Sequence, residues 1–140
     1  MKSAYRPLVV VLGLCAVMVG ISVWRKASEP EDHLPWRASF AAATQEAAKS
    51  GKPTLAYFTA TWCPPCQAMK HETWPRPEVG RALERFVPVK VDVDQAPDIA
   101  ARYVGEGIPR IQLLYPDGTP WKAHEGYFDA EELIRWLQAP

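Results

Sequence analysis

The sequence predicts an α/β domain with a four-stranded mixed sheet flanked by helices, preceded by one N-terminal transmembrane helix. Three observations support this prediction. Apolar, β-branched runs alternate with helical segments through the last three quarters of the chain, as in strand–helix–strand units. A turn signal and a capped helix follow near the C-terminus. An uncharged run of 17 residues lies near the N-terminus, at the short limit of a bilayer span.

The composition excludes several classes of protein. A chain of 140 residues allows one domain of ordinary size. Sixteen Lys+Arg residues balance 16 Asp+Glu residues, and this zero net charge argues against a nucleic-acid binder. A hydrophobic content of 48% excludes intrinsic disorder. Three cysteines are too few for a disulfide-stapled scaffold, but they are enough for one redox pair and a spare.

The N-terminal region is expected to anchor the chain. We predict a cytoplasmic leader at residues 1–7, a transmembrane signal anchor at 8–24, a linker at 25–35 and the folded domain at 36–140. A cleaved signal peptide is the alternative, although no small-x-small cleavage pattern precedes the basic pair at 25–26. The leader is basic and the linker contains acids, so the domain is expected to face the periplasm from a single-pass anchor in the cytoplasmic (inner) membrane.

The first half of the domain is predicted as a helix, a strand and two helical pieces. Residues 36–49 are Ala-rich, with apolar residues at helical spacing. Residues 54–59 (TLAYFT) are β-branched and aromatic, as in a buried strand. A helix is expected from residue 63 toward residue 74, where prolines break it, and residues 77–86 continue as a second piece.

The second half is predicted to complete the sheet. Strands are expected at 87–93, 110–115 and 119–124, and helices at 97–104 and 129–138. Asp129 is the expected N-cap of the last helix, and Glu132 is its capping-box acid. The strand–helix–strand unit implies parallel strands with a right-handed crossover, and the late hairpin adds an antiparallel pair.

The chemistry is expected at Trp62-Cys63-Pro64-Pro65-Cys66, where a strand turns into a helix. Helix positions three apart share one face, so the two sulfurs meet. Cys63 at the helix N-terminus gains a stabilised thiolate from the unpaired amides and the dipole. We therefore assign Cys63 as the attacking thiolate and Cys66 as the more buried resolving thiol. Pro64 suits the first helical turn, and Pro65 stiffens the loop.

Two other uses of the cysteine pair are less well supported. A zinc site normally needs four ligands, and there is no second CxxC. The histidines His33, His71 and His124 lack ligand spacing to the pair. A merely structural disulfide fits poorly with the Trp-flanked strand-to-helix context. We therefore expect no metal and no cofactor beyond the redox-active Cys63–Cys66 disulfide.

Three stretches carry a family resemblance: GKPTLAYFTATWCPPCQAMK, VKVDVDQAP and YVGEGIPRIQLLYPDG. They resemble the thioredoxin superfamily, and most of all periplasmic thioredoxin-like domains such as the C-terminal domain of the thiol:disulfide interchange reductase DsbD. The resemblance covers essentially all of the soluble domain and implies a thioredoxin fold. It also implies that Pro109 is the family's cis-proline beside Cys63, and that Ile108 presents backbone to an extended substrate. Trp62, adjacent to Cys63, is expected to border the substrate groove.

The sequence departs from the family pattern behind the cysteines. Thioredoxins usually carry a buried Asp six residues before the first cysteine, and Tyr57 stands there. The family's nearby lysine is present as Lys90, while Lys70 stands where DsbD-like domains have Glu. We expect Tyr57 to contact Lys90 and no buried carboxylate to assist Cys66, so that water or the substrate thiolate removes its proton. Plain core packing is the alternative for Tyr57.

The resulting prediction is a thiol:disulfide oxidoreductase that reduces protein disulfides outside the cytoplasmic membrane. Its expected partners are protein thiols and disulfides, a transmembrane electron donor and the membrane itself, with no nucleic acid, and the protein is expected to be a monomer. The redox direction cannot be read from the residues, because it depends on how far the reduced form is stabilised. A disulfide oxidase or isomerase, or a non-catalytic thioredoxin-like binding module, therefore stay open.

Overall fold

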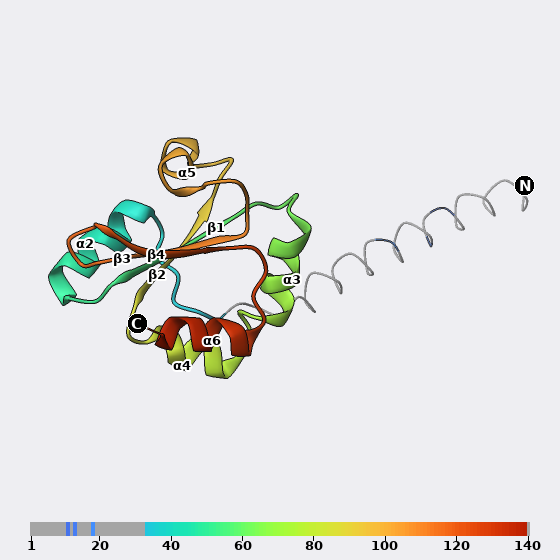
Figure 1. Ribbon diagram of the computed structural model, residues 1–140. Coiled ribbons are helices and arrows are strands. Elements are labelled where there is room, and N and C mark those ends of the chain that lie inside the picture. The colour runs from blue at the N-terminus through green and yellow to red at the C-terminus, as the bar shows by residue number, and fades with distance from the viewer. Residues whose placement is uncertain (1–10, 12, 14–17, 19–32, 140) are drawn as a thin grey trace, which may run out of the picture. The chain divides into compact units, whose positions relative to one another are not determined.

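The computed structural model describes Val11, Gly13, Met18 and residues 33–139 (Figure 1). The chain divides into two compact units, Met1–Glu31 and Asp32–Pro140. The three described residues of the first unit are helical. Apart from these three residues, the predicted anchor at 8–24 lies outside the described residues, as does most of the predicted linker. Within the described part of the chain, no helix is both long enough and apolar enough to cross a membrane.

The second unit is built on a four-stranded sheet in the order β2-β1-β3-β4. Its strands are β1 (Thr54–Thr59), β2 (Val87–Asp92), β3 (Arg110–Leu114) and β4 (Pro120–Glu125). Strands β1 and β2 are parallel, whereas β3 is antiparallel to both β1 and β4. The predicted mixed sheet, with its parallel unit and its late hairpin, is confirmed.

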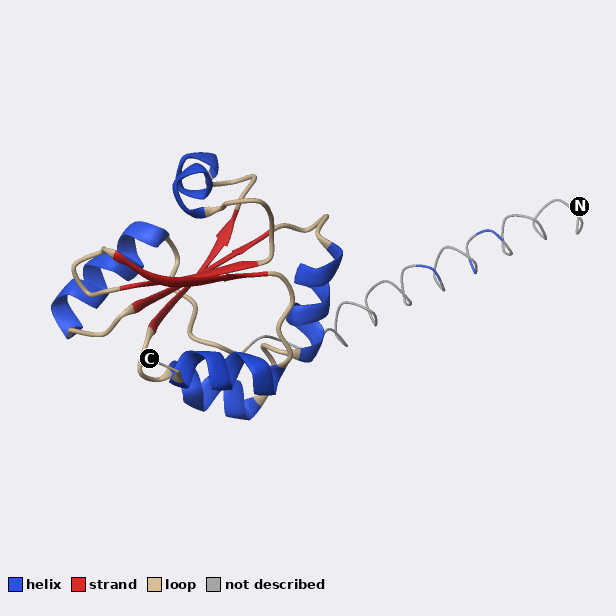
Figure 2. Ribbon diagram, in the orientation of Figure 1, coloured by secondary structure: helices blue, strands red, loops and turns tan. Residues whose placement is uncertain are grey.

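Helices cover both faces of this sheet (Figure 2). They are α2 (Phe40–Ser50), α3 (Pro64–Glu72), α4 (Pro77–Leu83), α5 (Pro97–Tyr103) and α6 (Ala130–Gln138). Side chains alternate along β1, so Leu55 and Tyr57 join the core under α3, α4 and α6. Ala56 and Phe58 face the other way and pack with residues of α2 and α5. The junction of β1 and α3 holds a third, smaller cluster of buried residues, which includes Ala60.

The first helix of this unit starts later than the sequence predicts. It begins at Phe40 rather than Trp36, because the Ser39 side chain caps it by accepting a hydrogen bond from the Ala42 amide at 3.1 Å. Trp36 instead packs against the core, with its ring 5.2 Å from that of Trp74. The apolar spacing that predicts a helix from Trp36 therefore includes a residue that is apolar because of a tertiary contact, not because it lies on a helical face.

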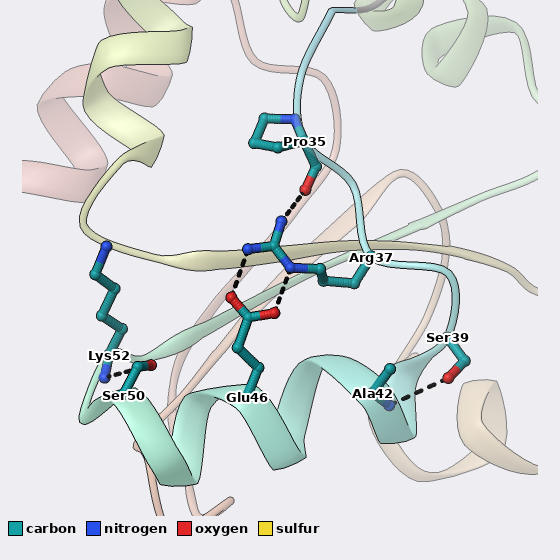
Figure 3. Close-up of polar contacts among 7 residues, drawn as sticks. All are labelled: Pro35, Arg37, Ser39, Ala42, Glu46, Ser50 and Lys52. Atoms are coloured by element: carbon teal, nitrogen blue, oxygen red, sulfur yellow. Dashed lines mark hydrogen bonds and ion pairs between the residues drawn. The ribbon is translucent and has the colours of Figure 1, made fainter.

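Arg37 joins the segment before α2 to the edge of the sheet (Figure 3). Its amide donates to the Pro88 carbonyl at 2.9 Å and forms a single parallel bridge with β2. Its guanidinium binds both carboxylate oxygens of Glu46 at 2.5 Å and also donates to the Pro35 carbonyl. The segment before α2 is thus fixed to both a strand and a helix.

The last helix begins as predicted. Asp129 accepts from the Glu132 amide at 2.8 Å, and the Glu132 carboxylate accepts from the Asp129 amide at 3.2 Å. This capping box starts α6, whose buried Leu133 and Leu137 pack into the core.

Candidate active site

Cys63 lies at the junction of β1 and α3, where it is the N-cap of the helix. Its extended backbone (φ −92°, ψ 108°) ends the loop, and its sulfur accepts from the Cys66 amide at 3.3 Å. This amide is one of the first donors of the helix, which have no partner within the helix itself. A thiolate at Cys63 would therefore gain one backbone hydrogen bond and the favourable end of the helix dipole.

Cys66 is joined to Cys63 by a disulfide, with the two Cα atoms 5.3 Å apart. The residues are almost equally buried, at 2% exposure for Cys63 and 1% for Cys66. Burial therefore hardly separates the two cysteines, and the assignment of Cys66 as the resolving thiol stays a prediction. The two cysteines differ in their neighbours. Cys63 contacts the segment before β3, whereas Cys66 lines a cavity.

Pro64 and Pro65 occupy the first two positions of α3. Neither position needs an amide hydrogen, because the first N–H groups of a helix have no intrahelical acceptor. Both prolines therefore fit the helix start without loss of a hydrogen bond, and they fix two backbone φ angles beside the disulfide.

Ile108 and Pro109 lie directly against the disulfide. The Ile108 carbonyl oxygen is 3.6 Å from the Cys63 sulfur, and the Ile108–Pro109 peptide bond is cis. Ile108 packs against the buried cluster that holds both cysteines, and Pro109 is buried. The structure thus brings Cys63 close to the Ile108–Pro109 peptide, which begins 45 residues further along the chain.

Trp62 lies beside Cys63 with 63% of its surface exposed. Its indole N–H donates to the Asp94 carboxylate at 2.7 Å. Asp94 follows β2 and was not among the predicted site residues. The signal that could have found it is its place just after a strand parallel to β1, because neighbouring parallel strands end at the same edge of a sheet.

A cavity of about 310 Å³ lies behind Cys66. Tyr57, Lys70, Lys90 and Asp92 contribute to its lining together with Cys66. The buried Tyr57 hydroxyl donates to the Cys66 carbonyl at 3.4 Å. Tyr57 and Lys90 are direct partners in the β1–β2 register, and the Lys90 ammonium lies 5.0 Å from the ring centre of Trp36.

The expected Tyr57–Lys90 side-chain contact stays a prediction. So does the absence of carboxylate assistance to Cys66, because the half-buried Asp92 lines the same cavity. One oxygen of Asp92 accepts from the Asp94 amide at 2.9 Å. Sequence spacing did not single out Asp92, since it is the β1–β2 register that places it beside this cavity.

Tyr127 lies on the chain just after β4, next to Gly126, whose amide donates to the Pro109 carbonyl at 2.8 Å. Its hydroxyl donates to the Glu72 carboxylate at 2.9 Å. This hydrogen bond to an anion is the main reason that the pKa of Tyr127 is raised above 10.0. The tyrosine thus stays a neutral donor that links the end of α3 to the segment beside Pro109.

The described residues form no group of three or more His, Cys, Asp or Glu side chains that could hold a metal ion. His33 lines a different cavity, and His124 stacks on Phe128 at a ring distance of 3.5 Å. The cysteine pair is therefore the reactive group that the geometry supports. In thiol–disulfide exchange at such a pair, one cysteine thiolate attacks a disulfide to give a mixed disulfide, and the second cysteine then attacks the first and releases the reduced product.

Comparison with known proteins agrees with this geometry. The thioredoxin-like domain family matches residues 40–139. A thioredoxin-like protein of Synechocystis is 38% identical over 100 residues, which are 71% of this chain and 91% of that protein.

Solved structures give the same result. A thioredoxin from Thermus thermophilus has a TM-score of 0.67 at 29% identity, covering 75% of this chain and 85% of that one. The reduced DsbD C-terminal domain of Neisseria meningitidis has a TM-score of 0.59 at 29% identity, covering 72% and 93%. Proteins of this kind need no cofactor beyond the redox-active disulfide. Sequence, fold and active-site geometry agree, and the chain belongs to the thioredoxin-like domain family of thiol–disulfide oxidoreductases.

Proposed function

We propose that this oxidoreductase is a membrane-anchored reductase of protein disulfides, with its catalytic domain facing the periplasm. The observation that carries the proposal is the Cys63 sulfur, 3.6 Å from the Ile108 carbonyl and beside the exposed Trp62. Backbone groups and an aromatic surface next to the attacking sulfur suit an extended polypeptide more than a small thiol. The substrate is therefore a disulfide within a protein.

The reductive direction is supported by the proteins that this chain resembles. Both a thioredoxin and the DsbD C-terminal domain are 29% identical to it over most of their length. A reductase in the periplasm needs electrons from the cytoplasm, so the partner on the donor side is a transmembrane electron carrier. The single-pass anchor is supported by the uncharged run at 8–24 and the basic residues before it.

The reduction potential of the Cys63–Cys66 pair tests the direction. Equilibration with glutathione buffers should give a value close to the about −270 mV of thioredoxin. A value close to about −120 mV would instead identify an oxidant and overturn the reductase proposal.

The substrate class and the location need separate tests. Wild-type protein should reduce insulin, and Cys63→Ser should not. Equal rates for both would show a binding module without catalysis. Cys66→Ser should trap a mixed disulfide with its protein partners. In spheroplasts, a membrane-impermeant thiol reagent should label reduced Cys63, and labelling only after lysis would place the domain in the cytoplasm.

A further inference from the structure

The segment between α5 and β3, residues 104–109 (VGEGIP), holds the Ile108 carbonyl beside Cys63. It has neither helix nor strand structure, and it contains Gly105 and Gly107. Glycine has more backbone freedom than any other residue. A fixed position for Ile108 therefore requires contacts from outside the segment.

The carboxylate of Glu125, the last residue of β4, supplies these contacts. Its Oε2 atom accepts from the Glu106 amide at 3.2 Å. A Cβ atom at Gly105 would lie 3.3 Å from Oε2, and one at Gly107 would lie 3.5 Å from Oε1. One carboxylate therefore binds the Glu106 amide and lies close to the glycines on either side, whose missing side chains leave it room.

Arg110 holds this carboxylate in place. It is directly opposite Glu125 in the β3–β4 register, and its Nη1 atom donates to Oε2 at 3.0 Å. The side chains are only 20% and 30% exposed, so this ion pair is less screened by water than a typical surface pair. The next residue, Gly126, donates its amide to the Pro109 carbonyl at 2.8 Å. The end of β4 thus fixes the segment at two points.

We propose that Glu125 is a positioning residue for exchange with protein disulfides. Its carboxylate, oriented by Arg110, fixes residues 105–108 so that the Ile108 backbone meets an extended substrate beside Cys63. The inference rests on the proposed protein substrate, because a small disulfide needs access to the Cys63 sulfur but not an ordered peptide-binding segment.

Glu125→Ala and Glu125→Gln test the proposal. The rate constants of the reduced variants are measured with insulin and with oxidised glutathione. Glu125→Ala should lower the rate constant with insulin about tenfold. This factor corresponds to the low end of the free-energy range for a hydrogen bond to a charged group. Glu125→Gln keeps a neutral acceptor of about half the strength, so the loss should be about threefold. The glutathione rate and the reduction potential should not change.

Glu46→Gln is the matched control, since it removes an Arg–Glu pair whose side chains are 29% and 43% exposed (Figure 3). It lies on α2 and should lower stability without changing the ratio of insulin to glutathione rates. An unchanged ratio in folded Glu125→Ala would overturn the proposal, as would equal losses with both disulfides. If Glu125→Ala does not fold, the same criteria apply to Glu125→Gln.

The proposed reductase function can fail separately. In that case wild-type protein would not reduce insulin, and the exchange is then measured in the oxidative direction. Reduced unfolded ribonuclease and reduced glutathione serve as the two partners. The same tenfold selective loss is expected, because the segment would contact the polypeptide in either direction.

Discussion

The charge of Lys70 should influence the reduction potential of the active site. Lys70 lies four residues after Cys66 on α3, and both residues line the same cavity. A positive charge stabilises a nearby thiolate and therefore the reduced form. Lys70→Glu puts a carboxylate at the position where DsbD-like domains have one, and it should make the potential more negative.

The magnitude follows from the helix geometry. Residues four apart on a helix have Cβ atoms about 5–6 Å apart. At ~7 Å, two unit charges interact by roughly 0.6 kcal/mol in bulk water and roughly 2.4 kcal/mol at an effective dielectric constant of 20. We take about 1 kcal/mol per unit charge, a value between these two limits. Lys70→Glu changes the charge by two units, so the free-energy difference between the reduced and oxidised forms changes by about 2 kcal/mol, or about 40 mV for a two-electron couple. Lys70→Gln should give about half this shift.

The assay is equilibration of each variant with thiol buffers, followed by alkylation and mass measurement. Lys49→Glu is the control, because Lys49 lies in the last turn of α2, on the other face of the sheet and before the start of β1. The six residues of β1 span about 20 Å, well beyond the roughly 8 Å screening length at physiological salt. Wild-type potentials in both Lys70 variants, or an equal shift in Lys49→Glu, would refute the reasoning.

Three further predictions concern stability and the inner cavity. Asp129→Ala should lower the free energy of unfolding by about 1–2 kcal/mol in urea, because it removes the carboxylate that accepts from the Glu132 amide. The loss should exceed that of Ser39→Ala, because the Asp129 carboxylate is a charged acceptor at the positive end of the helix dipole and the Ser39 hydroxyl is neutral. The pKa of His124 is lowered below 6.5, mainly by burial, so the stability present above pH 6.5 should be lost as the pH falls through the folded-state pKa. Melting temperatures should show this loss in wild type but not in His124→Gln. Tyr57→Phe removes the hydroxyl that donates to the Cys66 carbonyl, and unfolding should become easier by about 1 kcal/mol with insulin reduction retained. Loss of that activity would assign the hydroxyl a catalytic part.

The sequence predicts those elements best whose causes are local. Strand β1 was predicted to the residue, because its run of β-branched and aromatic side chains is bounded by turn signals on both sides. The capping box of α6 is likewise contained in four residues. The predicted start of α2 is wrong by four residues. Trp36 packs on Trp74, a partner 38 positions away that no local pattern reveals.

In the candidate site, too, the features with local causes are predictable from the sequence and the others are not. The cysteine pair and its helix start are readable from the motif, and the place of Pro109 beside Cys63 came from the family resemblance. The Glu125 carboxylate was missed, because its contact with Glu106 depends on the β3–β4 register. Register is set by how strands pair in three dimensions, which a single sequence specifies only weakly.

The contact of Arg37 with β2 has a consequence for how the molecule handles its substrates. Unfolded or extended polypeptides are the molecules most prone to add themselves to a free sheet edge and to start aggregation. Arg37 already occupies part of the β2 edge, and its guanidinium is paired with Glu46 on α2 (Figure 3). At the other edge, Pro120 lacks an amide donor and the β3–β4 ladder is irregular at Leu113/Leu114. Within the described part of the chain, both edges of the sheet are thus poor templates for strand addition, which protects an enzyme that acts on protein disulfides from edge-to-edge aggregation with unfolded polypeptides.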